Sequence, residues 1–422
     1  MSEFALTDPE RAVLISFRDS DQKAEARRAE IILLSADGAT VTAIKKAVKL
    51  SESQIYRWRR EWKQQRLAIF PDQTAAAPVE TVEVVEVTET VEPAPPGVES
   101  PRLPLELNEK MGVLPDDSMA EAARKVLCFS FERMLLNEPG SRLGENIEAV
   151  HDMRVATRRM RSAIRLFRPF FKANTIKPFE HALRDVARLL GEVRDLDVFM
   201  DKAQHFAQEN PELSLDPLVI IWQKRLNKAR RALIRHLNSK AFARFVDQFH
   251  AFVTTPGAGA RALPGPEEAV AYQVRYIAPR VIYEHYEGVR AYQAVLDGAP
   301  LTTLHALRID FKRFRYTLEF FEEVLGPEIK TVIKETKVMQ DHLGDLNDTH
   351  VASGVLVDFI DEQNANYSGV PVFMRPDISG VQQYALATDA EQQRLLDTFP
   401  AAWASFNRDE VRRALALAIA VL

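Results

Sequence analysis

With 422 residues, 46% of them hydrophobic, the chain can form two or three structural units around a substantial core. Its one cysteine, Cys128, excludes a disulfide framework and a cysteine-based metal site. Because there is no signal-peptide pattern and no apolar run long enough to cross a bilayer, we expect a soluble cytoplasmic protein. The formal net charge of −5 comes from residues 71–118, which hold 11 acidic and 2 basic side chains, so partners are inferred from local charge patterns.

Residues 1–72 are predicted to form a small helical unit. Asp8, which precedes a proline, marks a helix start, and a second helix is expected over residues 22–35. Thr40 and Ser51 can each cap a further short helix. Two helices joined by a tight turn are suited to reading the major groove of DNA.

The segment RRAEIILLSADGATVTAIKKAVKLSESQIYRWRREWKQQ resembles the helix-turn-helix unit at the front of many transposases. That resemblance implies sequence-directed DNA binding, although no transposase catalytic domain follows. The alternative is a small helical domain used for protein contacts or dimerisation. The candidate DNA contacts are Ser53, Gln54, Arg57 and Arg60.

Residues 73–117 are predicted to be a disordered acidic linker. Their core is rich in Pro, Val, Thr and evenly spaced Glu and has no aromatic residue, so it cannot bury enough apolar area to fold. Charge repulsion keeps such a segment extended. The alternative is a short strand over residues 82–87, where apolar and polar residues alternate weakly.

Residues 118–422 have a helical pattern divided by clusters of Pro and Gly, the first of them at residues 137–144. Two motifs recur in this region at a separation of 153 or 154 residues, which indicates an internal duplication into repeats 118–255 and 268–422. Each repeat has room for four helices. The sequence therefore predicts an all-α fold of two packed four-helix bundles behind the helix-turn-helix unit and its flexible linker.

The first recurring motif, VHDMRVATRRMRS, begins at Val150 and places basic residues on one helix face. At about 100° per residue, His151, Arg154, Arg158, Arg161 and Arg165 share that face. Like charges at this spacing destabilise a helix, so we interpret the stripe as an anion-binding surface. Equivalent or similarly spaced residues complete the predicted site: Lys177, His181, Arg184, Arg188, Lys224, Lys228, Arg231, Arg235, His305, Arg308, Lys312, Arg315, Lys330, Lys334, Lys337, Arg394, Lys125 and Arg280.

If the two repeats dock about a pseudo-twofold axis, their basic faces meet across a groove or channel suited to a linear polyanion. The alternative is a set of solvated amphipathic helix faces. His151 and His305 are interpreted as phosphate donors, because neither motif has a second histidine at metal-ligand spacing. Asp195 and Asp348, in the second recurring motif, LGxxxD, are expected to cap helices or fix an arginine. No nucleophile–base constellation is recognisable, so we expect a binding protein, and we expect no metal and no cofactor.

Residues 118–422 resemble a CHAD domain, the conserved-histidine α-helical domain, on HDMRVATRRMRS, its echo HALRIDFKRFRY and the two LGxxxD segments. The resemblance implies two four-helix bundles with internal twofold symmetry, which bind inorganic polyphosphate along a basic central tunnel. It also implies an association with polyphosphate granules and with triphosphate tunnel enzymes. The polyphosphate ligands that the resemblance implies are His151, Arg154, Arg158, Arg161 and their second-repeat matches. Glu319 occupies the position equivalent to Arg165, so we expect the first repeat to dominate binding.

The resulting hypothesis is a non-enzymatic polyphosphate-binding protein with a tethered DNA-binding head, located at polyphosphate granules or the nucleoid. A second hypothesis is a nucleic-acid-binding protein whose basic stripes contact DNA or RNA phosphates. A third is an enzyme that processes phosphate polymers.

Overall fold

The computed structural model divides into two units, residues 1–94 and residues 95–422, each of which is described by itself. Apart from two isolated antiparallel bridges, the regular secondary structure of the described residues is helical. None of the described helices combines the length and the apolar character needed to cross a membrane. The structure describes residues 6–18, 23–37, 39–48, 55, 58–59, 62, 66, 108–144, 147–262, 265 and 270–422.

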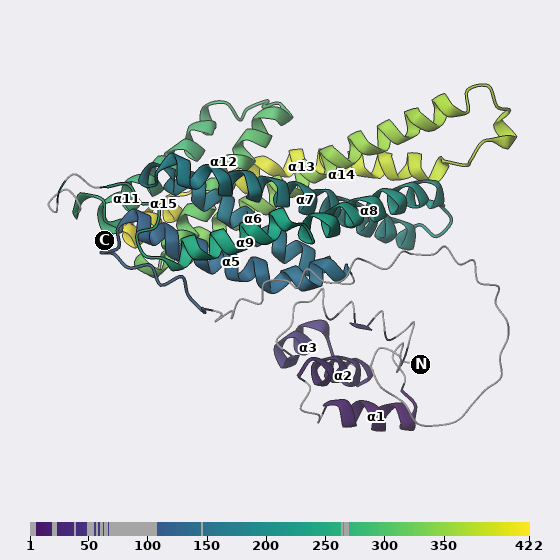
Figure 1. The fold of residues 1–422 in the computed structure, drawn as a ribbon. Coiled ribbons are helices and arrows are strands. Elements are labelled where there is room, and N and C mark those ends of the chain that lie inside the picture. Colours follow the sequence, from purple (N-terminus) through teal and green to yellow (C-terminus); the bar gives the residue numbers. More distant parts are fainter. Residues whose placement is uncertain are drawn as a thin grey trace. The chain divides into compact units, whose positions relative to one another are not determined.

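The first unit contains α1 (Asp8–Arg18), α2 (Lys23–Ala36) and α3 (Val41–Val48), drawn in purple in Figure 1. Apolar residues at helical spacing bury one side of each helix in a common small core. The fully buried members of that core include Leu14, Ala29, Ile32, Ile44, Ile55 and Trp62.

Side-chain caps define two of these helix starts. Thr7 Oγ1 accepts a hydrogen bond from the Glu10 backbone N–H (3.4 Å), and the Glu10 carboxylate accepts one from the Thr7 backbone N–H (2.9 Å). Hydrogen bonds from Arg66 hold the pKa of Glu10 at about 2. Thr40 Oγ1 accepts a hydrogen bond from the Ala43 N–H (3.3 Å), which confirms the predicted cap, whereas Ser51 lies outside the described residues.

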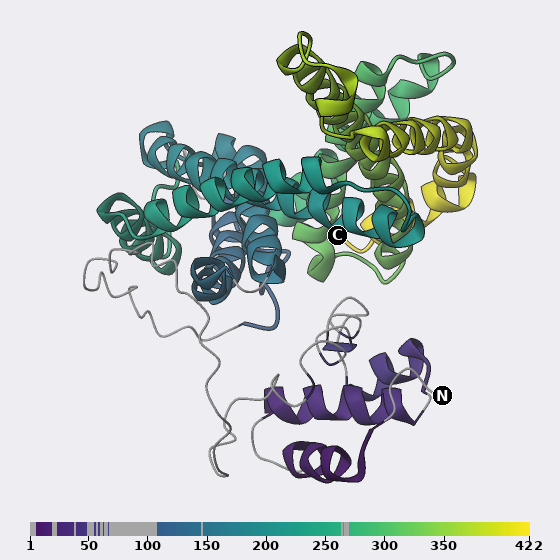
Figure 2. The ribbon, with the colours of Figure 1, turned by 90° about the vertical axis from the view of Figure 1, so that its right-hand side faces the viewer.

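The second unit consists of two copies of one helical arrangement (Figures 1 and 2). The predicted fold of two four-helix bundles with pseudo-twofold symmetry is confirmed, and in each bundle the fourth helix is interrupted to give a short fifth helix. Copy 1 contains α5 (Met119–Leu143), α6 (Ile147–Phe167), η2 (Arg168–Phe170), α7 (Ala173–Glu209), α8 (Asp216–Leu237) and α9 (Lys240–Thr254). Copy 2 contains α11 (Val274–Arg290), η3 (Ala291–Ala294), α12 (Leu301–Phe321), η4 (Glu322–Val324), α13 (Ile329–Asn366), η5 (Val372–Met374), α14 (Ser379–Phe406) and α15 (Asp409–Ile419).

Helix α5 differs from its sequence-based prediction. A break was expected over residues 137–144, but the helix continues through Pro139 to Leu143 and ends at Gly144, whose φ of 69° is left-handed. A Cβ atom on Gly140 would lie 2.7 Å from the Cβ of Ala149, so this glycine allows a close approach of α5 to α6. The close packing of α5 against α6 therefore stabilises helix where local composition favours a loop.

Backbone hydrogen bonds join the starts of α5 and α11. The Met119 N–H donates to the Tyr272 carbonyl (3.0 Å), and the Val274 N–H donates to the Asp117 carbonyl (2.9 Å). Each bond is the twofold equivalent of the other, because Asp117 and Met119 correspond to Tyr272 and Val274 in the repeat. These paired bonds place the pseudo-twofold axis between the starts of the two helices.

Apolar contacts join the copies in two places. Phe167 at the end of α6 packs against Phe320 and Phe321 of α12, with ring centroids 6.3 and 5.8 Å apart. A second apolar cluster joins the far ends of α7 and α8 to α13 and α14, where Phe206 and Tyr384 have centroids 4.9 Å apart. The two copies therefore form one domain.

Residues 108–117, the described part of the predicted linker, pack against both copies: Asn108 bonds to Glu132 of α5 (2.9 Å), and other residues bond to copy 2. The Glu323 carboxylate accepts hydrogen bonds from the successive N–H groups of Met111, Gly112 and Val113 (2.7, 2.7 and 3.1 Å), and the Val113 side chain is buried. The ordered domain therefore begins before Ser118, whereas residues 73–107 lie outside the described residues.

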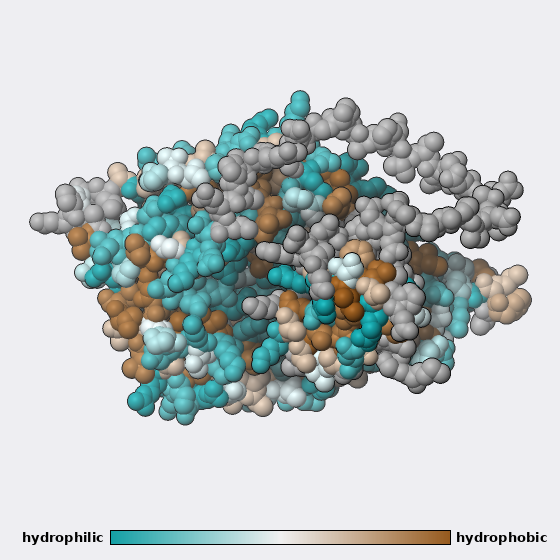
Figure 3. Space-filling model, turned by 90° about the horizontal axis from the view of Figure 1, so that it is seen from below, coloured by the Kyte–Doolittle hydropathy of each residue, from teal (hydrophilic) through white to brown (hydrophobic). Residues whose placement is uncertain are grey.

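On the face shown in Figure 3, hydrophilic side chains cover broad areas and hydrophobic patches lie between them.

Candidate functional site

Helix α6 presents its basic motif on a different face from its core contacts. Met153, Met160 and Ile164 are buried in the core, whereas Arg154 and Arg158 are half-buried. Apolar positions recur at three- and four-residue spacing, which drives the helix to pack, and the same period aligns the arginines with one another.

Equivalent basic residues of the two copies meet where α6 lies against α12. The ammonium group of Lys312 is close to the guanidinium groups of Arg154, Arg158 and Arg308. Burial, followed by the positive charges of these arginines, lowers the pKa of Lys312 to about 7. These four residues are hereafter the central cationic cluster.

Two carboxylates border the central cationic cluster. The Arg154 Nη2 atom lies 3.3 Å from Asp195 Oδ1 on α7, and Arg308 Nη2 lies 4.0 Å from Asp348 Oδ1 on α13. Burial raises the pKa of Asp195, and the positive charge of Arg154 opposes that effect. The matched contacts confirm the expectation that the aspartates of the LGxxxD segments fix arginines. Two carboxylates beside four basic groups leave an excess of positive charge.

Three side-chain nitrogen atoms at this site have no hydrogen-bond partner within the described chain. They are Nε of Arg158, Nε of Arg308 and Nδ1 of His151, all of them buried. The equivalent of His151 in copy 2 does have a partner, because His305 Nδ1 lies 2.7 Å from Asn347 Oδ1. A buried donor without an acceptor costs about 1–3 kcal/mol, so the site is suited to a ligand that supplies several oxygen acceptors.

Arg194 is a candidate site residue that the sequence analysis did not select. It lies on α7 within the first LGxxxD segment, and after burial its charge is the largest cause that lowers the pKa of His151. Its charge also contributes to lowering the pKa of Arg154. Its copy 2 equivalent is Asn347, the partner of His305. The signal was a basic residue inside a recurring motif, but Arg194 does not belong to any of the regular basic stripes.

Arg315, a predicted ligand, is instead engaged at the interface of α6 and α12. Its guanidinium lies 3.5 Å from the carboxylate of Glu319, which also pairs with Arg159 of the other copy. The guanidinium carbons of Arg315 and Arg159 lie 5.3 and 5.8 Å from the ring centre of Tyr316. Glu319 thus neutralises two interface cations at the position where copy 1 has Arg165.

Other predicted residues lie outside the central cationic cluster. Arg161 and Arg165 continue the α6 stripe and are exposed, and the charges of Arg165 and Arg184, after burial, lower the pKa of Arg161. Such exposure is what the hypothesis of solvated helix faces predicts. The same exposed character is found for Lys177, His181, Arg184, Arg188, Lys224, Lys228, Arg231, Arg235, Lys330, Lys334 and Lys337.

Three further predicted residues have other surroundings. The Lys125 ammonium lies 2.7 Å from Asp117, where it stabilises the segment that precedes α5. Arg394 pairs with Glu391 at 2.7 Å on the exposed side of α14. Arg280 lines a separate pocket beside α11.

Within the described ranges, no group of three or more His, Cys, Asp or Glu side chains is placed to hold a metal ion. The four predicted DNA contacts lie outside these ranges, so the structure gives no geometry for Ser53, Gln54, Arg57 or Arg60.

The helical architecture and the repeated histidine–arginine motif define the class of this protein. Residues 125–357, more than half of the chain, match the family model of the CHAD domain, and the chain belongs to that family. Residues 23–69 match the model of a homeodomain-like domain.

One solved structure is similar in fold, and two curated proteins are similar over part of the sequence. The crystal structure of the CHAD domain from the plant Ricinus communis aligns with 69% of this chain and 94% of its own, with a TM-score of 0.53 and 23% identity, and this likeness concerns the fold. Uncharacterized proteins from two strains of Mycobacterium tuberculosis are 28% identical over 246 residues. The match covers 56% of this chain and 45% of theirs, so the chain spans less than half the length of these relatives.

Proposed function

We propose that the CHAD domain of this protein binds inorganic polyphosphate at the central cationic cluster and does not cleave it. The observation that carries the proposal is the set of buried, unpartnered nitrogen atoms of His151, Arg158 and Arg308, of which the two arginine N–H groups are donors. They lie among basic groups whose charge exceeds that of the neighbouring carboxylates. Anionic oxygens at this place would satisfy the donors and offset the repulsion between the cations.

The form of the basic surface favours a thin, linear polyanion. The cluster residues are half-buried between the copies, which suits a bare phosphate chain better than a bulky duplex. From Arg154 to Arg165, the α6 stripe extends about 16 Å along the helix, which is longer than a single phosphate group. Successive phosphates of one chain can therefore contact successive arginines, whose forked donors match phosphate oxygens.

The carboxylates at the site support binding rather than hydrolysis. Asp195 and Asp348 are engaged by Arg154 and Arg308, and these contacts orient the arginines. Incubation of the protein with polyphosphate and Mg²⁺ or Mn²⁺ should leave the chain length unchanged on a gel. Progressive shortening would contradict this part of the proposal and favour a phosphate-polymer-processing enzyme.

Calorimetric titration with size-defined polyphosphate tests the binding proposal. The variant Arg154→Ala/Arg158→Ala/Arg161→Ala should bind at least about a hundredfold more weakly, because each charged hydrogen bond contributes about 1.5–3 kcal/mol. Affinity in the wild type should fall steeply with salt as counterions are released. The control is Arg413→Ala, which changes an exposed arginine of α15 and should bind like the wild type. Equal affinity of the triple variant, with unchanged helicity, would refute the proposal.

We further propose that the N-terminal unit is a DNA-binding head, so that the protein links polyphosphate to the nucleoid or to polyphosphate granules. The match of residues 23–69 to a homeodomain-like domain supports this role. Arg57→Ala in the full chain should weaken binding to duplex DNA and leave polyphosphate affinity unchanged. If polyphosphate and duplex DNA instead compete for the CHAD domain, the basic stripes are a nucleic-acid surface.

A further inference from the structure

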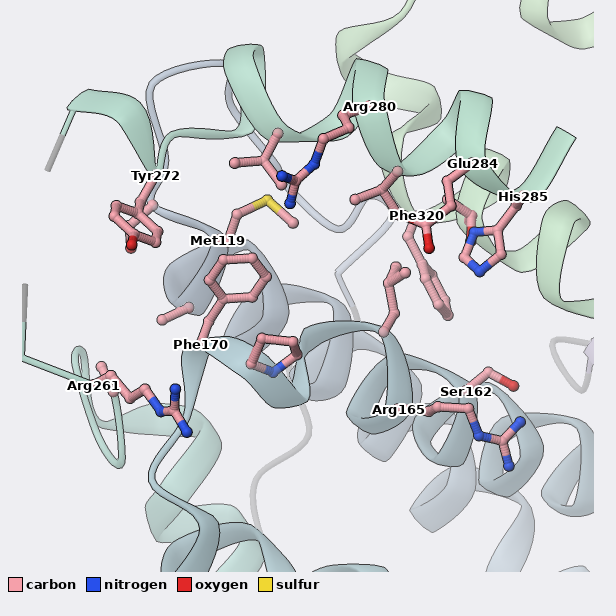
Figure 4. A pocket seen from close by; sticks show the side chains of 18 of the residues that line it. Met119, Ser162, Arg165, Phe170, Arg261, Tyr272, Arg280, Glu284, His285 and Phe320 are labelled. Carbon is pink, nitrogen blue, oxygen red and sulfur yellow. The ribbon is translucent and has the colours of Figure 1, made fainter. Parts of the chain in front are cut away.

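A cavity separate from the central cationic cluster lies between the end of α6 and the helices α11 and α12. Its volume is about 830 Å³, and Figure 4 shows its lining. Tyr316 and Phe320, which are 2% and 1% exposed, stack with centroids 6.1 Å apart and line its α12 side. Arg158 of the cluster lies with its guanidinium carbon 5.7 Å from the Tyr316 ring. This aromatic pair therefore separates the pocket from the cluster.

The pocket combines basic groups with an apolar surface. Arg280 extends into it from α11, whereas Arg165 lies at its α6 edge with its guanidinium turned away from Arg280 and Phe170 (Figure 4). Neither guanidinium forms an ion pair or hydrogen bond within the described chain. Phe170 and Tyr272, whose rings meet edge to face with centroids 6.3 Å apart, lie with Met119 along the α5 and η2 side.

The lining also includes uncharged and acidic hydrogen-bonding groups. The hydroxyl of Tyr316 is buried without a partner in the described chain. Glu284 and Ser162 border the pocket, and His285 Nδ1 lies 3.1 Å from the Thr317 hydroxyl. A carboxylate repels a bare phosphate chain, but it can accept hydrogen bonds from amino or hydroxyl groups of a ligand.

The cavity at the pseudo-symmetric position, on the other side of the α6–α12 contact, has a different balance of charged groups in its lining. There a cavity of about 660 Å³ is lined by Arg133, Arg159 and Lys330, but also by Glu319, Glu322 and Glu323. Because carboxylates balance those cations, duplication alone does not account for the basic excess at Arg165 and Arg280.

We propose that the pocket beside α11 binds a nucleotide. The guanidinium group of Arg280 holds its phosphates, while Phe170 and Tyr272 pack against the base. Glu284 accepts hydrogen bonds from the amino or ribose hydroxyl groups. A polyphosphate chain would gain nothing from the apolar surface, whereas a planar ring joined to phosphates uses both kinds of lining.

Calorimetry of the full chain with ATP and with tripolyphosphate, which lacks the nucleoside, tests this assignment. Arg280→Ala should weaken ATP binding at least tenfold and change affinity for long-chain polyphosphate less than twofold. Arg154→Ala/Arg158→Ala should give the reverse pattern. Tyr272→Ala, at an exposed ring, should weaken ATP binding without changing tripolyphosphate binding.

Each result has a definite meaning. No ATP binding by the wild type, or ATP binding that is lost in Arg154→Ala/Arg158→Ala and kept in Arg280→Ala, would overturn the nucleotide assignment. Equal sensitivity of ATP and tripolyphosphate to Tyr272→Ala would overturn it as well, because the pocket would then recognise phosphates alone. Since the two ligands are measured separately, failure of nucleotide binding leaves the polyphosphate proposal intact, and the reverse also holds.

Discussion

Helices α6 and α12 occupy equivalent positions in the two copies but differ in how their basic residues are engaged. On α6, no acidic residue occurs from Arg154 to the end of the helix, and buried nitrogen atoms of His151 and Arg158 lack partners in the described chain. On α12, Arg315 pairs with Glu319, and the equivalent histidine, His305, contacts Asn347. Both helices contribute cations to the central cationic cluster, but α12 also carries a carboxylate, Glu319, that pairs with a cation of the other copy.

This difference shows that pseudo-symmetry of the backbone does not require symmetry of function. A helix whose cations all repel one another is destabilised unless an anion or an acidic neighbour compensates. Glu319 provides such compensation for Arg159 of the other copy. Copy 2 can therefore stabilise the basic surface of copy 1 and still contribute Arg308 and Lys312 to the ligand site.

Removing the compensating carboxylate should have the largest effect. Glu319→Ala leaves two half-buried guanidinium groups without their partner and should lower the free energy of unfolding by about 3 kcal/mol. Urea unfolding of the full chain, followed by circular dichroism, measures the change. Glu391→Ala, which removes the exposed partner of Arg394, is the matched control and should have a far smaller effect. Equal losses in the two variants would show that Glu319 has no special role at the interface.

Paired variants in the two copies measure their asymmetry in binding. Arg154→Ala/Arg158→Ala should reduce polyphosphate affinity about a hundredfold, and Arg308→Ala/Lys312→Ala about tenfold, because Lys312 is partly neutral at pH 7. Calorimetry with polyphosphate of one defined length gives both values. Similar reductions for the two pairs would mean that the copies contribute equally.

The titration of Lys312 should make polyphosphate affinity depend on pH, with a smaller effect than the double substitutions. Its pKa is lowered from 10.5 to about 7, so the ammonium is charged below pH 7 and loses its proton as the pH rises. Affinity for long polyphosphate, whose internal phosphates stay ionised, should fall by up to about tenfold between about pH 6 and 8.5. Lys312→Arg should abolish most of this dependence, since arginine stays protonated. An unchanged pH profile in that variant would assign the effect to another group.

Helix capping differs between the copies and gives the smallest predicted change. Ser118 caps α5 by accepting a hydrogen bond from the Glu121 N–H (3.2 Å), whereas its equivalent Gln273 makes no side-chain cap on α11. Ser118→Ala should cost about 1 kcal/mol, and Gln273→Ser should gain a few tenths to about 1 kcal/mol. Thermal unfolding of both variants tests the signs, and destabilisation by Gln273→Ser would contradict the capping argument.

Much of the fold could be predicted from the sequence because its determinants are local or periodic. The two recurring motifs gave the duplication, and apolar spacing gave the helices. The break expected over residues 137–144 occurs only at its end, Gly144, since the helix through Pro139 and Gly140 depends on close packing against a neighbouring helix. Residues 111–113 bind Glu323, more than two hundred residues later, and acidic composition gave no sign of that contact.

The site was predictable in part for the same reason. Helical period shows which residues share a face, so Arg154, Arg158, Arg308 and Lys312 could be selected. It does not show which face meets the other copy, and for that reason the exposed stripes of α7, α8 and α13 were selected as well. The pairing of Glu319 with Arg159 across the interface likewise depends on how the copies dock.

The reciprocal hydrogen bonds between Met119 and Tyr272 and between Val274 and Asp117 have an evolutionary consequence. Such exchange of equivalent partners characterises the isologous contact of a homodimer, so a single ancestral copy could have paired with itself through these residues. In a homodimer every substitution occurs twice, and an acidic residue that stabilises one subunit would also cancel a cation in the ligand site of the other. Fusion of two genes removes that constraint, because Glu319 can then be acquired once, beside an Arg165 that is retained.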